Sequence, residues 1–223
     1  MYMSNKIVNY KNKKNNNVIV VDGIIGAGKT TLSDFLKERY NLFFYQEIVD
    51  DHDLSLTQEM LDLFYNNPSR WSAMTQIMFL SHRFKDLKEA EKKDSFCLFD
   101  RSIYGDEIFA YNLFKRGEMT SQEYKIYQGL LGPLLKEINP PHLLIYLDVT
   151  VDTAMNRIKK RSRSTEANQI PRAYMEDLKN AYDVWFDAFD LCHKIKLDFN
   201  DDGLSVSTLA LLDESLKGVG PRV

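Results

Sequence analysis

The chain has 223 residues, and its 29 basic and 32 acidic side chains leave a formal net charge of −3. A hydrophobic share of 44% and a charged share of 27% are typical of a globular domain with a sizeable core, which excludes wholesale disorder, collagen-like repeats and coiled coils. The acidic balance gives no electrostatic case for a nucleic-acid partner, and no apolar run approaches the ~18–20 residues that a membrane span needs.

Short apolar runs alternate with longer amphipathic stretches along the chain. The first run, VIVVD at 18–22, is rich in β-branched residues, which is typical of a buried parallel strand. Strands that alternate with helices predict an α/β domain with a doubly wound, five-stranded parallel sheet flanked by helices, and ligands at the carboxyl ends of the strands. In chain order we expect strand 18–22, helix 30–40, strand 42–46, helices 54–66 and 69–92, strand 96–100, helices 103–116 and 120–137, strand 142–147, helices 150–161 and 171–191, strand 195–199 and helix 204–216.

The two ends of the chain depart from this pattern. Residues 1–17 hold six Asn, four Lys and no acid, which is typical of a disordered tail. A mitochondrial presequence is the alternative, although such segments are typically rich in Arg and this one has none. We expect a single domain over 18–217 and a flexible end at 218–223. The only two cysteines, Cys97 and Cys192, are far apart, which favours a reducing compartment such as the cytoplasm over a disulfide scaffold.

A phosphate-binding motif follows the first predicted strand. Residues 23–30 read GIIGAGKT and match G-x-x-x-x-G-K-[ST] between a strand and a helix. Backbone N–H groups of such a loop wrap phosphates, Lys29 reaches the β- and γ-phosphates, and the Thr30 hydroxyl can ligate Mg²⁺. A glycine-rich turn without a ligand is the alternative. The motif predicts ATP and Mg²⁺ as ligands, held by Gly23, Ile24, Ile25, Gly26, Ala27, Gly28, Lys29, Thr30 and Thr31.

An acidic segment follows the second predicted strand. Glu47 begins it, and the segment 46–53 reads QEIVDDHD. A carboxylate there can orient an acceptor hydroxyl and take its proton, while its acidic neighbours repel an acceptor that already carries a phosphate. The segment therefore favours a neutral alcohol as acceptor, with a solvated acidic loop as the alternative.

The third predicted strand ends in an acid followed by a base. FCLFD at 96–100 resembles a Walker-B strand, and Asp100 would help to hold Mg²⁺. Arg101 can hold the transferring phosphoryl group or the acceptor oxygen. An ordinary strand-end salt bridge is the alternative.

A basic segment lies late in the chain. Arg157 and Arg161 are four residues apart and share a helix face, and Arg163 follows them. Such guanidinium groups can close over a triphosphate as a lid, which we expect at about 157–170. A solvated basic face and a localisation signal are the alternatives.

Taken in order, these motifs resemble the deoxynucleoside kinase family of P-loop kinases over about 18–199. The resemblance implies transfer of phosphate from ATP to the 5′-hydroxyl of a deoxynucleoside in nucleotide salvage. It also implies a homodimer and inhibition by the end-product triphosphate. It rests on GIIGAGKTT, Glu47, LDLFYNNPSRW, Gln76, DRSIYGD and RIKKRSRSTE.

By position, the resemblance implies a role for each matching residue. Glu47 would be the base that activates the 5′-hydroxyl, assisted by Arg101, and Asp100 would be the carboxylate linked to Mg²⁺. Other positions would hold the sugar 3′-hydroxyl, read the base, line its pocket and form the lid. In that order they are Tyr65 and Glu166; Gln76, Arg83 and Asp106; Phe79 and Phe109; and Arg157, Arg161 and Arg163.

The base readers favour some acceptors over others. Gln76 and Arg83 are two turns apart on one predicted helix face, and an amide can both donate to and accept from a base edge. In the family, an Arg/Asp pair such as Arg83 with Asp106 goes with purine or cytosine nucleosides. We therefore expect deoxyadenosine, deoxyguanosine or deoxycytidine rather than thymidine, with deoxyadenosine favoured because 157–166 resembles bacterial lids. Two polar positions on a surface helix are the alternative.

Two other functions remain open from the sequence. A thymidylate-kinase-like enzyme needs a cation near the second strand to hold the acceptor's phosphate, whereas 46–53 is acidic. A non-catalytic nucleotide-binding module would not need Glu47, Asp100 and Arg101 together. The chain also departs from the family, because Ile48 stands where many members have Pro and Thr165 where many have Glu.

Overall fold

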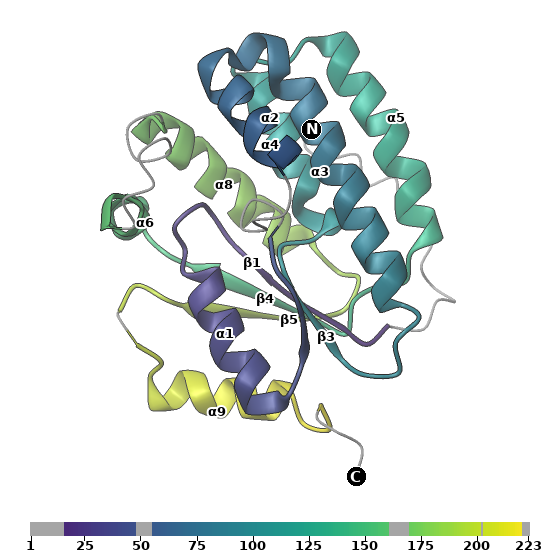
Figure 1. Cartoon of the computed structure of the whole chain (residues 1–223). Coiled ribbons are helices and arrows are strands. Elements are labelled where there is room, and N and C mark those ends of the chain that lie inside the picture. Colours follow the sequence, from purple (N-terminus) through teal and green to yellow (C-terminus); the bar gives the residue numbers. More distant parts are fainter. Residues whose placement is uncertain (1–15, 48–54, 161–169, 202, 220–223) are drawn as a thin grey trace.

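Figure 1 shows a computed structural model of the chain, which describes residues 16–47, 55–160, 170–201 and 203–219. One parallel sheet contains all the strands of these ranges, in the order β2-β3-β1-β4-β5. This confirms the predicted five-stranded parallel sheet. The strands are β1 (Val18–Asp22), β2 (Phe43–Tyr45), β3 (Cys97–Asp100), β4 (Leu143–Asp148) and β5 (His193–Asp198).

The strand register brings the predicted site residues to one edge of the sheet. Val21 of β1 pairs with Asp100 of β3, and Asp22 pairs with Tyr146 of β4. From β1 the chain runs through α1 to β2 at the sheet edge and later returns to β3 beside β1. It then crosses to β4 on the other side of β1, so the strand order changes direction next to β1. A ligand crevice is expected outside the carboxyl ends of the strands at such a point.

Helices cover both faces of the sheet. Figure 1 shows α1 and α9 on one side, and α8 with the bundle of α2, α3, α4 and α5 on the other. β1 is buried along its whole length, as its β-branched sequence predicts. The helices are α1 (Lys29–Tyr40), α2 (Ser55–Asn66), α3 (Pro68–Ala90), α4 (Asp106–Lys115), α5 (Ser121–Glu137), α6 (Val151–Lys160), α8 (Arg172–Ala188) and α9 (Val206–Ser215), with a 3₁₀ turn at Ile103–Gly105.

Helix starts follow local capping rules. Asn67 caps α3 through its side chain, which accepts from the backbone N–H of Arg70, and Pro68 is the first residue of the helix. The expected start at 69 was one residue late, because Pro lacks an N–H that the first turn does not need. Thr120 and Glu123 form a reciprocal capping box at the start of α5. The expected helix 103–116 divides into the 3₁₀ turn and α4.

The described residues extend a little beyond the predicted domain at both ends. The backbone N–H of Asn16 donates to Pro140 at 2.9 Å, and the carbonyl of Asn17 accepts from Cys97 at 2.8 Å. These two residues therefore belong to the domain, as does the buried Val219. The remaining predicted tails, 1–15 and 220–223, lie outside the described residues, as does 161–169 of the predicted lid. No helix in the described ranges has the length and apolarity to cross a bilayer.

Candidate active site

The phosphate loop joins β1 to α1 through glycines that other residues could not replace without strain. Gly26 has a φ of 77°, and a Cβ built on it would lie 2.5 Å from the carbonyl oxygen of Ala154. Gly28 has a φ of 97°, and its Cβ would lie 2.8 Å from the Phe199 ring. The loop is therefore packed tightly against α6 and the end of β5, with its backbone N–H groups at the start of α1.

Lys29 is buried beneath this loop. Its Nζ donates to the carbonyl of Ile24 at 3.2 Å. Burial lowers the pKa of Lys29, and the nearby Arg101 charge lowers it further, against the opposing carboxylates of Asp100, Glu47 and Asp22. An anion bound in the loop would stabilise the charged ammonium.

Thr30 and Asp100, the two oxygen ligands predicted for Mg²⁺, lie in contact with each other. The Thr30 hydroxyl donates to Asp100 Oδ2 at 3.0 Å. Asp100 is buried, and its Oδ1 has no hydrogen-bond partner among the described residues. Burial raises the Asp100 pKa to about 6, and the charge of Glu47 adds to this, while Lys29 and Arg101 oppose it. An unsatisfied carboxylate oxygen beside a hydroxyl fits Mg²⁺, which takes one or two protein oxygens and completes its ligands with water and phosphate.

Glu47 meets two guanidinium groups just after β2. Its Oε1 accepts from Arg101 Nε at 2.8 Å and from Arg83 Nη2 at 3.4 Å. Burial alone would raise its pKa, but the charges of Arg101, Lys29 and Arg83 outweigh burial, and the Glu47 pKa is lowered. Glu47 is therefore an ionised carboxylate in a fixed orientation, as an acceptor-orienting group requires.

Arg101 lies at the centre of the site in an unusual backbone conformation. Its φ is 68°, in the left-handed region, and its side chain is 4% exposed. The guanidinium lies 4.7 Å from the ring centroid of Phe109, a residue that was predicted to line the base pocket. Arg101 Nη1 also contacts Asp22 and Tyr182, two residues that the sequence analysis did not select.

Of the predicted base readers, Gln76 and Asp106 are buried and the Arg83 side chain is 11% exposed, so Gln76 and Arg83 are not polar positions on a solvent-facing helix surface. Arg83 pairs with Asp106, which is fully buried and also accepts from the Tyr127 hydroxyl at 3.3 Å. The Arg83 guanidinium lies 5.2 Å from the Phe79 ring centroid. Gln76, two turns before Arg83 on α3, is 4% exposed, and its Oε1 has no hydrogen-bond partner among the described residues.

The remaining predicted residues divide between the described and undescribed parts of the chain. Tyr65, at the end of α2, packs against the small cluster of Leu61 and Phe79. Glu166, Arg161 and Arg163 lie outside the described residues.

Arg157, the first predicted lid arginine, contacts the phosphate loop. Its Nη1 donates to the carbonyl of Ala27 at 3.1 Å, and its Nη2 donates to the carbonyl of Asp201 at 3.1 Å. The guanidinium lies 5.7 Å from the Phe199 ring centroid. Arg157 therefore connects the phosphate loop to the segment after β5.

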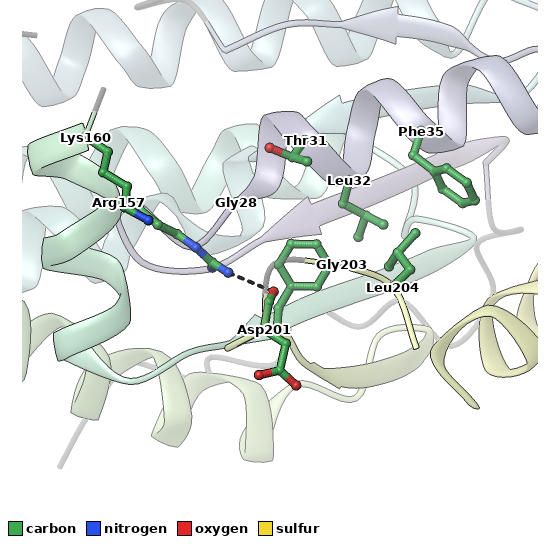
Figure 2. Close-up of a pocket in the computed structure, with 11 residues that line it drawn as sticks. Gly28, Thr31, Leu32, Phe35, Arg157, Lys160, Asp201, Gly203 and Leu204 are labelled. Carbon is green, nitrogen blue, oxygen red and sulfur yellow. Dashed lines mark hydrogen bonds between the residues drawn. The ribbon is translucent and has the colours of Figure 1, made fainter. Parts of the chain in front are cut away.

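A cavity of about 560 Å³ lies beside the loop, and Figure 2 shows Arg157 reaching toward Asp201 in it. The flat aromatic ring of a nucleotide base fits a cavity of this volume. Thr31 on α1 was among the predicted residues, but Leu32 and Phe35 of α1 and the segment after β5 were not, although the end of a fifth strand is a signal for that segment. The lining residues are Gly26, Gly28, Thr31, Leu32, Phe35, Arg157, Lys160, Phe199, Asp201, Gly203 and Leu204.

Comparisons with known proteins agree on one family. The model for the deoxynucleoside kinase family matches residues 19–210. A deoxyadenosine/deoxycytidine kinase of Bacillus subtilis (strain 168) is 35% identical over 189 residues, with 83% of this chain and 84% of the relative covered. A deoxyguanosine kinase of Lactobacillus johnsonii is 34% identical over 189 residues, with 81% of each covered.

Solved structures give the same result. A deoxyadenosine kinase from M. mycoides, with the products dCMP and a flexible dCDP bound, has a TM-score of 0.78 at 25% identity, with 91% of this chain and 100% of that chain covered. The relatives carry different base names, so the comparisons support a phosphate transfer to a nucleoside without selecting its base.

Proposed function

The chain belongs to the deoxynucleoside kinase family, and from this premise we propose that it phosphorylates the 5′-hydroxyl of a purine or cytosine deoxynucleoside, deoxyadenosine above all. The proposal rests on one observation: polar residues that follow three neighbouring strands lie close together. Glu47 after β2, Asp100 with Arg101 at the end of β3, and the loop after β1 share one buried polar cluster.

On the donor side, the triphosphate of ATP lies on the phosphate loop and its base in the adjacent cavity. Lys29 neutralises phosphate charge, and Arg157 holds the loop from its other side. Thr30 and Asp100 would hold Mg²⁺, which supplies charge neutralisation of the phosphates when it is bound.

On the acceptor side, Glu47 orients the 5′-hydroxyl and accepts its proton. Arg101 holds Glu47 and faces the developing charge on the transferred group. Tyr65 and Glu166 would hold the sugar 3′-hydroxyl. The protein contributes mainly positioning and electrostatic stabilisation, because the phosphoryl group passes through a loose transition state.

The proposed base preference follows from the hydrogen-bonding groups of α3 and α4 at the site. The unsatisfied Oε1 of Gln76 and the buried Asp106 carboxylate both need N–H donors, and Arg83 supplies donors beside them. Adenine and cytosine carry an exocyclic amine next to a ring nitrogen, which matches such a mixed set. Thymine and guanine both carry a carbonyl in place of that amine, so the unsatisfied Gln76 Oε1 would face a second acceptor, and deoxyguanosine is expected to be a weaker substrate than deoxyadenosine.

Three further properties belong to the proposal. A homodimer is inferred from the family resemblance. Inhibition by the end-product triphosphate is expected, because that molecule carries both the base read by Gln76 and the phosphates bound near Lys29. A cytoplasmic location is favoured by the two free cysteines, Cys97 and Cys192, which suit a reducing compartment.

The test is an ATP-consumption assay with each of the four deoxynucleosides, with dTMP, and without an acceptor. We expect strong turnover with deoxyadenosine, weaker turnover with deoxyguanosine or deoxycytidine, and poor turnover with thymidine. Turnover on dTMP alone would support the thymidylate-kinase-like alternative. ATP consumption that no acceptor increases would support a module that only binds nucleotides.

A further inference from the structure

Three oxygen atoms, two from the β1–loop junction and one from α8, converge on Nη1 of the Arg101 guanidinium. Arg101 Nη1 lies 3.3 Å from Asp22 Oδ1, 2.9 Å from the carbonyl oxygen of Gly23 and 2.5 Å from the Tyr182 hydroxyl. Asp22 ends β1, Gly23 begins the phosphate loop, and Tyr182 lies on α8. The proposed reaction uses neither Asp22 nor Tyr182.

Within the part of the chain that the structure describes, two nitrogens of the guanidinium have partners and the third does not. Nε donates to Glu47 and Nη1 faces the three oxygens, while Nη2 has no hydrogen-bond partner within the described ranges. Arg101 has a backbone φ of 68°, which residues other than Gly rarely adopt. The surrounding contacts must therefore stabilise this backbone conformation. The Nη2 donors are thus left for the reacting oxygens.

We propose that Tyr182 is a positioning residue, which together with Asp22 fixes the Arg101 guanidinium against Glu47 so that its remaining donors face the transferred phosphoryl group. This inference rests on the role proposed above for Arg101. Tyr182 touches neither substrate in the proposed arrangement, and it acts through Arg101.

The Tyr182 hydroxyl suits this role because it both donates and accepts. It donates to Asp22 Oδ1 at 2.7 Å and accepts from Arg101 Nη1. Burial raises the pKa of Tyr182 well above its usual value, so the hydroxyl keeps its proton over the working range of pH. The rings of Phe109, Tyr146 and Trp185 surround the phenol at centroid distances of 6.0, 6.0 and 5.9 Å and leave it one orientation.

The Asp22 carboxylate is also held in place by its neighbours. Its Oδ1 also accepts from the backbone N–H of Gly23 at 2.8 Å. Gly105 approaches it so closely that a Cβ there would lie 2.6 Å from Asp22 Oδ2. The carboxylate is 1% exposed, so it faces Arg101 with little solvent screening.

Tyr146 provides a matched control for a merely structural hydroxyl. It is fully buried on β4, its ring stacks on that of Tyr182 at an interplanar angle of 3°, and its hydroxyl donates to Asp183 at 2.9 Å. Tyr146→Phe therefore removes a phenol–carboxylate hydrogen bond from the same aromatic stack without touching Arg101.

The experiment compares steady-state kinetics of Tyr182→Phe and Tyr146→Phe in the full-length protein, with ATP and the best deoxynucleoside. We expect Tyr182→Phe to lower kcat about tenfold or more while both KM values change less than about twofold, because only transition-state contacts are lost. Tyr146→Phe should keep kcat within about twofold of the wild type. Equal kcat values for the two variants would overturn the inference.

A double-mutant cycle with Arg101→Lys tests whether Tyr182 acts through the guanidinium. In the Arg101→Lys background, Tyr182→Phe should lower kcat by less than about twofold, since its target is already gone. A full additive loss would overturn the inference while leaving the role of Arg101 intact. Wild-type kcat in Arg101→Lys alone would instead remove the proposed role of Arg101, and this inference with it.

A second variant guards against a folding defect in Tyr182→Phe. Asp22→Asn keeps an oxygen for the Gly23 N–H and the Tyr182 hydroxyl but loses the charge that faces Arg101. It should lower kcat by about threefold or more with unchanged KM values. An unchanged kcat in a folded Asp22→Asn protein would contradict the assignment of Asp22.

Discussion

Glu47 shows how burial and charge act against each other at a single residue. Desolvation alone would favour the neutral acid, but Arg101, Lys29 and Arg83 keep the pKa of this carboxyl below its usual value. The group therefore remains a carboxylate at neutral pH, as the proposed role of orienting the 5′-hydroxyl and accepting its proton requires.

Glu47→Gln tests this role. The amide keeps the size of the side chain but cannot take a proton, so we expect kcat to fall at least about 100-fold with an unchanged fold. Kinetics with ATP and deoxyadenosine, and circular dichroism, measure the two effects. Glu59→Gln on the exposed side of α2 is the control. Near-wild-type turnover of Glu47→Gln would exclude Glu47 as the base.

Asp100 has the opposite balance, and it predicts a pH dependence. Its pKa is raised to about 6, because burial and the Glu47 charge outweigh the cations around it. Below this pH the carboxyl is protonated and is a poor ligand for Mg²⁺. The apparent affinity for Mg²⁺ with ATP should therefore fall about tenfold per pH unit below pH 6 and level off above it.

Calorimetric titrations between pH 5 and 8 measure this dependence, and the same series on Asp100→Asn corrects for the titration of ATP itself. Because a cation competes with the proton, the acidic limb of kcat/KM should move to lower pH as Mg²⁺ is increased. A limb that stays in place at all Mg²⁺ concentrations would assign the titration to another group.

At the scale of elements, the phosphate loop depends on close contact with α6. Gly26 and Gly117 have nearly the same φ, 77° and 73°, but a Cβ on Gly117 would meet nothing within 4 Å. Alanine at either position therefore adds backbone strain of about 1–2 kcal/mol. Only Gly26→Ala also pushes the loop away from Ala154 on α6.

This pair of variants separates strain from function. Gly26→Ala should raise the KM for ATP at least about tenfold, because the loop can no longer wrap the phosphates, whereas Gly117→Ala should leave it within about twofold. Thermal unfolding should show some loss of stability in both. If both variants bind ATP like the wild type, the packing of the loop against α6 has no part in nucleotide binding.

Local sequence signals predicted most of the elements and half of the site. Hydrophobic runs located all five strands, and the loop motif located Lys29 and Thr30. The contact of Tyr182 with Asp22 joins residues 160 positions apart, and no local pattern encodes it. In the sequence, Tyr182 cannot be distinguished from other aromatic residues of the core. Only its position beside Arg101 in the structure indicates a role for its hydroxyl.

At the scale of the whole molecule, the two regions proposed to bind ATP and the deoxynucleoside lie on either side of the charged cluster around Arg101. One is the cavity between α1, α6 and the segment after β5, and the other contains Gln76 and Arg83 on α3. The sequence predicted the second region through the family resemblance. Of the first it predicted Gly26, Gly28, Thr31 and Arg157 but not Phe199 and Leu204, because these are ordinary apolar residues until β5 brings them beside the loop.

This separation predicts that the two substrates can be weakened independently. Phe199, buried against Gly28 and below Arg157, lines the cavity assigned to the ATP base, and Phe79 lies beneath Arg83 in the region assigned to the deoxynucleoside. Phe199→Leu should raise the KM for ATP about three- to tenfold and leave that for deoxyadenosine unchanged, since a smaller side chain loses aromatic contact area with the base. Phe79→Leu should do the reverse.

Initial-rate kinetics with each substrate varied in turn measure these effects, and the double variant provides the internal control. Because the two rings lie in separate regions, their effects on binding should add in free energy. If Phe199→Leu raises the KM for deoxyadenosine and leaves that for ATP unchanged, the cavity beside α1 belongs to the acceptor, and the assignment of the two sides must be exchanged. Equal rises in both KM values would contradict the separation of the two regions.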